Sequence, residues 1–302
     1  MKSASSTVSL SSMPSPHPPN FGLPALGVGV GLRRKHIDRI ARERPAMRWF
    51  EFTPENYMDR GGRSRAQLFS VTPHYKMVCH GVGLGIGSVD PLDWDYLRSL
   101  KRIIRDTGAL WASDHLCWNR ADGRSSNDLL PLPFTAEAVR HTATRIRQVR
   151  EFLEVPFLVE NISAYAILPG AEMDEADFTK AVLEEADCGL VLDVNNCYVN
   201  RRNHGTDPHR FFRTVPAHRV GQMHLAGHDD RGDVCVDTHG SPVRDEVWAL
   251  FREALAVTGP TSVLIEWDNA IPTWERLCEE AAKAQAIYDE VVGVHPAAWA
   301  RT

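Results

Sequence analysis

Short apolar runs recur along the chain from Leu26 onward, and segments with helical spacing of apolar residues separate them. Strands of a parallel sheet are covered on both faces, so they are apolar throughout and do not alternate with polar positions. We therefore expect eight strands, at residues 27–32, 48–53, 76–80, 110–115, 157–160, 189–193, 220–224 and 262–266.

The intervening segments carry helix signals. Thr135 precedes a segment in which Val139, Ile146 and Val149 share one face, which predicts a capped helix ending at Leu153. Further helices are expected at residues 33–43, from about 91, at 174–186, 207–212, 241–257 and 272–291, with a polar loop at 119–133. Eight strand–helix units predict the α/β class and a single (β/α)8 TIM barrel.

The main alternative is a doubly wound open sheet, but it would not explain why nearly every predicted strand ends in a polar residue. These residues are Glu51, Glu55, His80, Asp114, His115, Glu160, Asp193, Asn196, His224 and Glu266. In a barrel the carboxyl ends of the strands converge on the face that carries the active site. The loop residues His228, Asp237 and His239 follow the seventh strand and should lie over that face.

So many carboxylates and imidazoles in one cavity need counter-charge. No Lys or Arg stands at the predicted strand ends, and Arg231 and Arg244 lie in loops. Metal ions would neutralise the carboxylates and bind neutral imidazoles. The mixed N and O ligands are too many for one ion, so two or three ions of Fe, Mn or Zn are expected. Taken singly, His80 could instead be a hydrogen-bonded structural residue, and Glu160 could pair with an Arg.

Composition narrows the class of protein. A hydrophobic fraction of 43%, a charged fraction of 24% and a net charge of −5 are typical of a soluble globular protein and favour neither nucleic-acid nor membrane partners. The six cysteines form no CxxC pair, which indicates reduced thiols in a cytoplasmic protein. Residues 1–22 are rich in Ser and Pro and lack the apolar core of a secretory signal. We expect a disordered tail there and one barrel domain over residues 23–302.

Seven motifs, in order, resemble those of the DUF692 or UPF0276 family. They are His-Gly-Val-Gly-Leu at 80–84, Ser-Asp-His-Leu-Cys-Trp at 113–118, Val-Glu-Asn-Ile-Ser at 159–163, Leu-Asp-Val-Asn-Asn-x-Tyr-Val at 192–199, His-Leu-Ala-Gly-His at 224–228, Asp-Thr-His-Gly at 237–240 and Ile-Glu-x-Asp at 265–268. The resemblance covers about residues 26–286. Characterised members are multinuclear non-heme iron-dependent oxidative enzymes (MNIOs) of the MbnB and TglH types, so it implies a xylose-isomerase-like barrel with two or three iron ions.

The resemblance also implies residue roles. The implied metal ligands are His80, His115, Glu160, Asp193, Asn196, His224, Asp237, His239 and Glu266. Asp114 and His228 are the implied catalytic residues, which orient imidazoles or water together with Glu55 and Asn56. Trp267 departs from the pattern, since many relatives are expected to carry Arg there, and this leaves the substrate open.

The implied chemistry is oxidation of a ribosomally synthesised precursor peptide, often at a cysteine, in RiPP biosynthesis. It uses O2 as co-substrate and iron in a mixed Fe(II)/Fe(III) state. A small partner protein that recruits the leader peptide is expected as well.

Two other functions remain open from the sequence. A Mn- or Zn-dependent sugar isomerase or phosphodiesterase of the same barrel shape would act without O2 and would need a Lys or Arg near the metals. A non-catalytic metal-binding partner protein would have a complete ligand set and no open coordination position.

Overall fold

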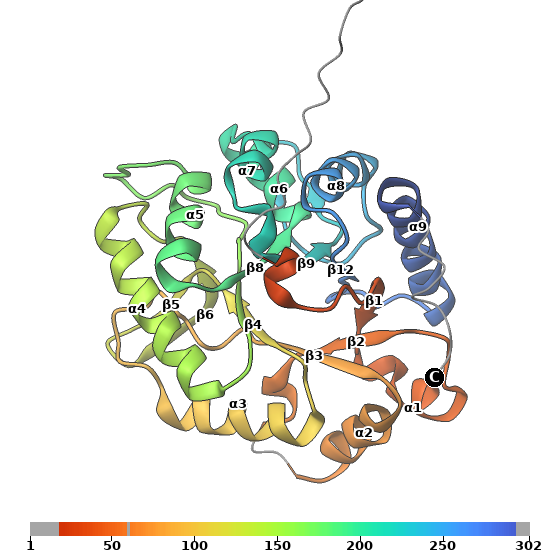
Figure 1. Ribbon diagram of the computed structural model, residues 1–302. Coiled ribbons are helices and arrows are strands. Elements are labelled where there is room, and N and C mark those ends of the chain that lie inside the picture. Colours follow the sequence, from red (N-terminus) through yellow and green to blue (C-terminus); the bar gives the residue numbers. More distant parts are fainter. Residues whose placement is uncertain (1–17, 59–60, 294–302) are drawn as a thin grey trace, which may run out of the picture.

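The computed structural model describes residues 18–58 and 61–293, and within them eight parallel strands close into a barrel in the order β1-β12-β9-β8-β7-β4-β3-β2 (Figure 1). The barrel strands are β1 (Val28–Gly31), β2 (Trp49–Phe52), β3 (Lys76–His80), β4 (Ala112–His115), β7 (Phe157–Glu160), β8 (Gly189–Asp193), β9 (Val220–Leu225) and β12 (Ser262–Ile265). Because β1 pairs in parallel with β12, the sheet has no edge. The predicted single barrel is confirmed, and the doubly wound sheet is excluded.

Helices surround the barrel (Figure 1). They are α1 (Arg34–Glu43), α2 (Arg63–Val71), α3 (Trp94–Thr107), α4 (Ala136–Leu153), α5 (Glu175–Ala186), α6 (Val194–His204), α7 (Pro208–Thr214), α8 (Asp245–Thr258) and α9 (Trp274–Val292). The Thr135 hydroxyl accepts the Ala138 N–H and caps α4, as predicted. Helix α8 begins at Asp245, four residues after the predicted start. Helix α6 was not predicted, because its buried face carries asparagines where a core helix usually carries an apolar stripe.

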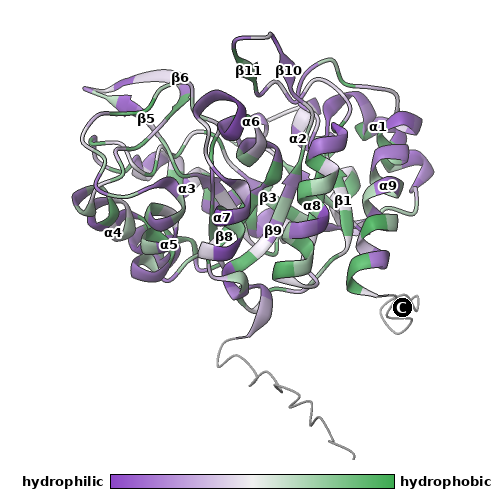
Figure 2. Cartoon of the chain, turned by 90° about the horizontal axis from the view of Figure 1, so that it is seen from above, coloured by the Kyte–Doolittle hydropathy of each residue, from purple (hydrophilic) through white to green (hydrophobic). Residues whose placement is uncertain are grey.

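Two antiparallel hairpins follow barrel strands and lie at the same edge of the molecule (Figure 2). One pairs β5 (Trp118–Ala121) with β6 (Arg124–Leu130), and the other pairs β10 (Asp229–Asp230) with β11 (Cys235–Val236). The expected polar loop at 119–133 is therefore wrong in part. Its hairpin turn is Asp122-Gly123, both at positive φ, and Asp-Gly is a strong signal for a two-residue turn.

The amino end of the barrel interior is closed by apolar side chains. The plug consists of Leu23, Leu26, Trp49, Val78, Trp111, Leu158, Val191 and Leu264. The Trp49 indole N–H donates to the Gly27 carbonyl at 3.1 Å, and the Trp111 indole N–H donates to Gln222 Oε1 at 2.8 Å. Both large rings therefore have fixed positions, and the polar strand ends lie toward the opposite face.

The ordered chain begins before the predicted domain boundary. Residues Pro19–Gly22 form a 3-10 helix with Asn20 buried, and the Leu23 N–H donates to the Asn20 carbonyl at 2.9 Å. The Arg219 guanidinium lies 5.8 Å from the centre of the Phe21 ring. The last residues of the predicted disordered tail, 19–22, are therefore helical, and residues 1–17 lie outside the described part.

All six cysteines are unpaired in the structure. No helix in the described ranges has both the length and the apolar character that crossing a membrane requires.

Gly29 makes room for the plug, because a Cβ at this position would lie 2.4 Å from the Trp49 ring. We expect Gly29→Ala to lower the free energy of unfolding by about 1–3 kcal/mol, since the ring must move within a packed interior. Urea denaturation measures the change. Gly61→Ala is the matched control, because its Cβ would meet no atom within 4 Å. Equal stability of the two variants would contradict the role of Gly29.

Candidate metal centre

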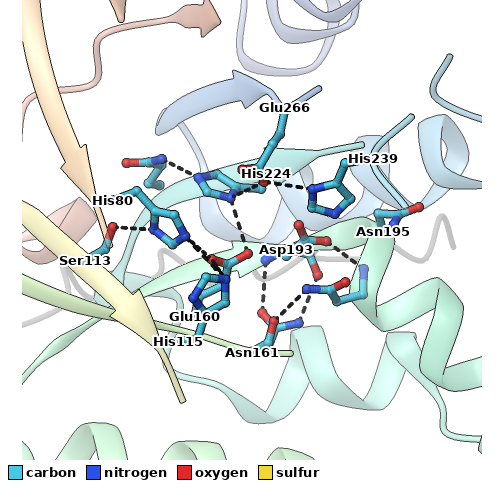
Figure 3. A network of polar contacts seen from close by, with 12 residues as sticks. His80, Ser113, His115, Glu160, Asn161, Asp193, Asn195, His224, His239 and Glu266 are labelled. Atoms are coloured by element: carbon cyan, nitrogen blue, oxygen red, sulfur yellow. Dashed lines mark hydrogen bonds and ion pairs between the residues drawn. The ribbon is translucent and has the colours of Figure 1, made fainter. Parts of the chain in front are cut away.

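Three side chains at the ends of neighbouring barrel strands form a first cluster (Figure 3). His80 ends β3, His115 ends β4 and Glu160 ends β7. Glu160 Oε2 lies 3.0 Å from His80 Nε2 and 3.4 Å from His115 Nε2, and the two Nε2 atoms are 3.4 Å apart. Two ligand atoms bound about 2.1 Å from one ion are separated by about 3.0–3.4 Å. The three atoms therefore have the spacing of ligands around one metal ion.

A second buried cluster contains Glu160, Asp193, His224 and Glu266, and each offers one ligand atom within 4.8 Å of the others. His224 Nδ1 lies 3.3 Å from Glu160 Oε1 and 3.0 Å from Glu266 Oε2. Glu160 belongs to both clusters and presents one oxygen to each. The two candidate ion positions are thus adjacent and share a carboxylate.

Several atoms at these clusters are buried without a hydrogen-bond partner. They are Glu160 Oε2, Asp193 Oδ2, Asn196 Oδ1, His115 Nδ1, His224 Nδ1 and His239 Nε2. Buried polar atoms nearly always have a hydrogen-bond partner in native proteins. A group of buried atoms without such partners at one place therefore fits the binding of a metal cation. Imidazole, carboxylate and amide oxygen together suit Fe, Mn or Zn. The residues present therefore fit a multinuclear metal centre.

Within the chain, the imidazoles supply the positive charge that these carboxylates need. Although burial alone would lower it, Glu160 and Glu51 raise the pKa of His80 to about 9. Burial would raise the pKa of Glu160, but His224, His80 and His115 hold it well below its ordinary value. Burial and the Glu160 charge raise the pKa of Asp193 well above its ordinary value. The cluster is acidic and buried, which is an environment that attracts a cation.

A layer of polar residues beneath the clusters orients the imidazoles. The Ser113 hydroxyl lies 2.8 Å from His80 Nδ1 and donates to the Cys79 carbonyl, so the ring turns Nε2 toward the first cluster. His224 Nε2 lies 3.2 Å from Glu51 Oε2 and 2.7 Å from the Gln222 amide nitrogen, which turns Nδ1 toward the second cluster. Such partners fix ligand orientation in metal sites.

Helix α6 starts directly at the end of β8. The Asp193 carboxylate caps it by accepting the Asn196 N–H at 2.6 Å. Asn161 brackets the same strand end, because it accepts the Asp193 N–H and donates to the Asp193 carbonyl. This local structure brings Asn196 to the cavity wall, with its amide nitrogen donating to the Asn161 carbonyl and its orphan Oδ1 unpaired.

Asp237 and His239 lie at the rim. His239 Nε2 is 2.8 Å from Asp237 Oδ1, and its Nδ1 is 3.1 Å from Asp268 Oδ2 and 3.4 Å from Glu266 Oε2. His239, Glu266 and Asp268 form a further group that could hold an ion. The Asn195 amide holds Asp237 by donating to Oδ1 at 2.6 Å.

The two residues expected to be catalytic do not line the cavity. Asp114 accepts the backbone N–H groups of Leu84 and His115. His228 Nδ1 lies 2.8 Å from Asn195 Oδ1, and its ring stacks on Tyr198. Both therefore hold neighbouring residues in place, and their expected catalytic role stays a prediction.

Glu55 and Asn56, expected to orient neighbouring groups, both line the cavity. One Glu55 oxygen, Oε1, accepts the Val82 and Gly83 N–H groups and the Tyr96 hydroxyl, which fixes the loop after β3. Its other oxygen, Oε2, is buried without a partner.

One sequence-based statement is wrong: a cation does accompany the strand ends. Arg33 follows β1 and lines the cavity, where its guanidinium forms ion pairs with Glu266 and Asp268 and donates to the Trp267 carbonyl at 2.8 Å. From the sequence, Arg33 was expected to begin the helix over residues 33–43. Its position directly after β1 was the available signal. Gln222 was also missed, Asp268 was noted only as part of the Ile-Glu-x-Asp motif, and Glu51 was noted only as a strand end.

The clusters open into a cavity of about 710 Å³, within the range of known ligand sites. Its wall includes Ser125, Asp128 and Leu129 of the β5–β6 hairpin and Thr238 of the loop after β11. Several of the expected ligands thus line a space that is large enough for part of a peptide.

Known proteins resemble this chain in sequence and in fold. Residues 27–289 match the family described as RiPP precursor modification enzyme MbnB/TglH/ChrH. A UPF0276 protein of Anaeromyxobacter sp. (strain Fw109-5) is 45% identical over 262 residues, covering 87% of this chain and 93% of the relative.

Among solved structures, the IolI protein with a bound zinc atom has a TM-score of 0.60 at 11% identity, covering 89% of this chain and 100% of that one. A xylose isomerase-like TIM barrel protein from Mycobacterium smegmatis in complex with magnesium has a TM-score of 0.57 at 12% identity, covering 85% and 89%. At these identities the likeness shows the fold alone, a xylose-isomerase-like TIM barrel.

The raised pKa of Asp193 predicts that the stability of the metal-free protein depends on pH. Above the ordinary carboxyl pKa of 3.8, the folded chain retains a proton that the unfolded chain has released, so this group lowers stability as pH rises. Asn also caps helices but does not titrate. We expect metal-free Asp193→Asn to be more stable than the wild type near pH 8, with the difference shrinking toward pH 4.

Chemical denaturation of chelator-treated protein at both pH values measures this difference. Asp207→Asn makes the same change at the exposed cap of α7 and should leave the pH dependence unaltered. A pH-independent difference between wild type and Asp193→Asn would contradict the prediction. The same variant should bind added Fe(II) more weakly than the wild type.

Proposed function

The chain belongs to the family of RiPP precursor modification enzymes MbnB/TglH/ChrH, and on this premise we propose that it is an O2-dependent multinuclear iron oxidase. Its substrate would be a ribosomally synthesised precursor peptide, modified at a cysteine or a nearby residue. A small partner protein that binds the leader peptide would assist it.

The observation that carries the proposal is the pair of buried clusters that share Glu160 beneath a large open cavity. His80, His115 and Glu160 would hold one ion, and Glu160, Asp193, His224 and Glu266 would hold a second. His239, Glu266 and Asp268 would hold a third ion at the rim, and Asn196 and Asp237 remain expected ligands there. Iron bound there would supply O2 activation and a position for a substrate thiolate.

The chain's own residues would prepare the site for that chemistry. Ser113 and the Glu51–Gln222 pair hold two imidazoles in register, so the ligand atoms need little rearrangement when ions bind. The apolar plug beneath them keeps water out of the barrel interior. Because Glu160 belongs to both clusters, ions held there would be neighbours, and a substrate group at one ion would be close to the other.

The open cavity disfavours a purely structural metal site, since such sites are closed by protein ligands. A Mn- or Zn-dependent isomerase or phosphodiesterase would need a Lys or Arg near the metals, and Arg33 is in that place. However, its guanidinium is paired with Glu266 and Asp268. It is therefore committed to neutralising site carboxylates rather than binding a phosphate or sugar.

The first test is metal content. Protein purified without chelator should contain two or three irons per chain by plasma mass spectrometry. Incubation with O2 and a precursor peptide encoded nearby should then change the peptide mass, and anaerobic incubation should not.

Glu160→Gln should abolish both iron binding and the mass change, because a neutral amide cannot replace the carboxylate that both clusters contain. Asp177→Asn, a surface change on α5, should preserve both. Zinc or manganese at similar occupancy, with activity independent of O2, would refute the oxidase in favour of the isomerase or phosphodiesterase. Iron-loaded protein that leaves its cognate peptide unchanged would refute peptide oxidation.

A further inference from the structure

A second cavity lies beside the metal cavity and shares its walls. Its volume is about 220 Å³, below the range of about 300–1,000 Å³ usual for whole small-molecule ligands, so it fits a single side chain better. Most of its wall is apolar and includes Leu132, Phe134, Ile162 and Phe178. We refer to it as the side pocket.

Four segments line both cavities at neighbouring positions. His115 faces the metal cavity while Leu116 lines the side pocket, and on α6 Asn196 faces the metal cavity while Asn200, one turn later, lines the side pocket. The same division recurs along the segment after β7 and along the segment from β6 into α4.

The segment after β7 shows the division most clearly. Ser163 lines the metal cavity and donates to Asp237 Oδ2 at 3.2 Å, whereas Ile162 and Ala164 line the side pocket. Asn200 fixes this segment, because its amide donates to the Ile162 carbonyl at 2.9 Å and accepts the Ala164 N–H at 2.8 Å. This segment is therefore part of the wall between the two cavities, and the side pocket lies directly next to the metal cavity.

The charges in the side pocket are one-sided. Its lining contains the carboxylates of Asp174 and Glu175 but no Lys or Arg, and its one imidazole, His204, is 2.7 Å from the Ala164 carbonyl oxygen through Nε2. Asp174 is satisfied, since it caps α5 and accepts from Arg210 at 2.6 Å. Within the described chain, Glu175 forms no ion pair with a Lys or Arg, and Asn200 is its hydrogen-bond donor, at 3.1 and 3.3 Å.

The first turn of a helix favours an acidic residue, which could explain Glu175 by itself. It does not explain an apolar cavity in front of that carboxylate. Burial, with a contribution from Asp174, raises the pKa of Glu175 to about 7. A buried carboxylate with one neutral donor gains most from a cationic partner.

We propose that the side pocket receives a lysine or arginine side chain of the substrate peptide, with its methylene stem on the apolar wall and its cationic head at Glu175. Lys and Arg combine an apolar stem with a charged tip, as this pocket requires. The inference rests on the proposed peptide-modifying function and adds a specificity rule: a basic residue close in sequence to the modified one.

The test uses two probes that differ only in the charged head, N-acetyl-lysine methylamide and N-acetyl-norleucine methylamide. Met173 lines the side pocket, so a protein labelled with methyl-¹³C methionine reports binding there, while the buried Met77 and Met223 serve as internal references. The lysine probe should shift the Met173 signal and bind about tenfold more tightly than the norleucine probe.

Glu175→Gln keeps the shape and the Asn200 hydrogen bond and should remove this preference. Asp177→Asn removes one charge from the same turn of α5 without touching the lining, and should retain it. Thermal melting confirms that both variants fold. Equal or tighter binding of the norleucine probe would overturn the cationic assignment, and no Met173 shift with either probe would overturn the pocket itself.

These binding measurements need neither iron nor catalytic turnover. Their outcome is therefore independent of whether the proposed oxidase function is correct. In a cognate precursor, replacing the basic residue by norleucine should raise KM about tenfold while iron content stays unchanged. Unchanged KM would refute the rule even where peptide oxidation is confirmed.

Discussion

Charge balance among buried carboxylates is the constraint on which the functional end of this protein depends. Glu160 is buried completely and lies within 3.4 Å of three imidazoles, from β3, β4 and β9. A carboxylate in such a place is tolerated only when cations surround it. Imidazolium rings and Arg33 can supply part of that charge, and metal ions would supply it with better geometry. The barrel thus gives up stability at this end to hold a site that attracts metal.

The apolar plug at the opposite end of the barrel offsets the destabilising effect of these buried carboxylates. Trp49 and Trp111 fill the interior with large buried rings, and both indole N–H groups have partners. Gln222 joins the two ends, because its carbonyl accepts from Trp111 while its amide contacts Glu51 and His224. The position of a candidate metal ligand is therefore set from the packed core, which is more rigid than the loops above it.

Much of the fold could be predicted because a barrel repeats one pattern. Apolar runs ending in polar residues placed all eight strands, and the convergence of strand ends placed His80, His115, Glu160, Asp193, His224 and Glu266 together. What the sequence could not show were contacts that depend on side-chain direction. Arg33 follows a strand but precedes a helix, and only its rotamer brings it into the cavity. Helix α6 escaped prediction for a related reason, since its buried asparagines satisfy backbone groups of other segments rather than packing as a core.

Those asparagines connect the metal centre to substrate selection. Asn161 and Asn196 fix the end of β8, and Asn200 fixes the segment after β7 with both hydrogen-bonding groups of its amide. A backbone segment clamped in this way cannot slide, so Ser163 stays on the metal side and Ile162 on the side-pocket side. The Asn200 amide, which fixes this segment between the two cavities, also donates to Glu175. Ligand geometry and the proposed recognition of a basic residue therefore share one hydrogen-bonded frame, which would link the choice of peptide to the position of the bond that reacts.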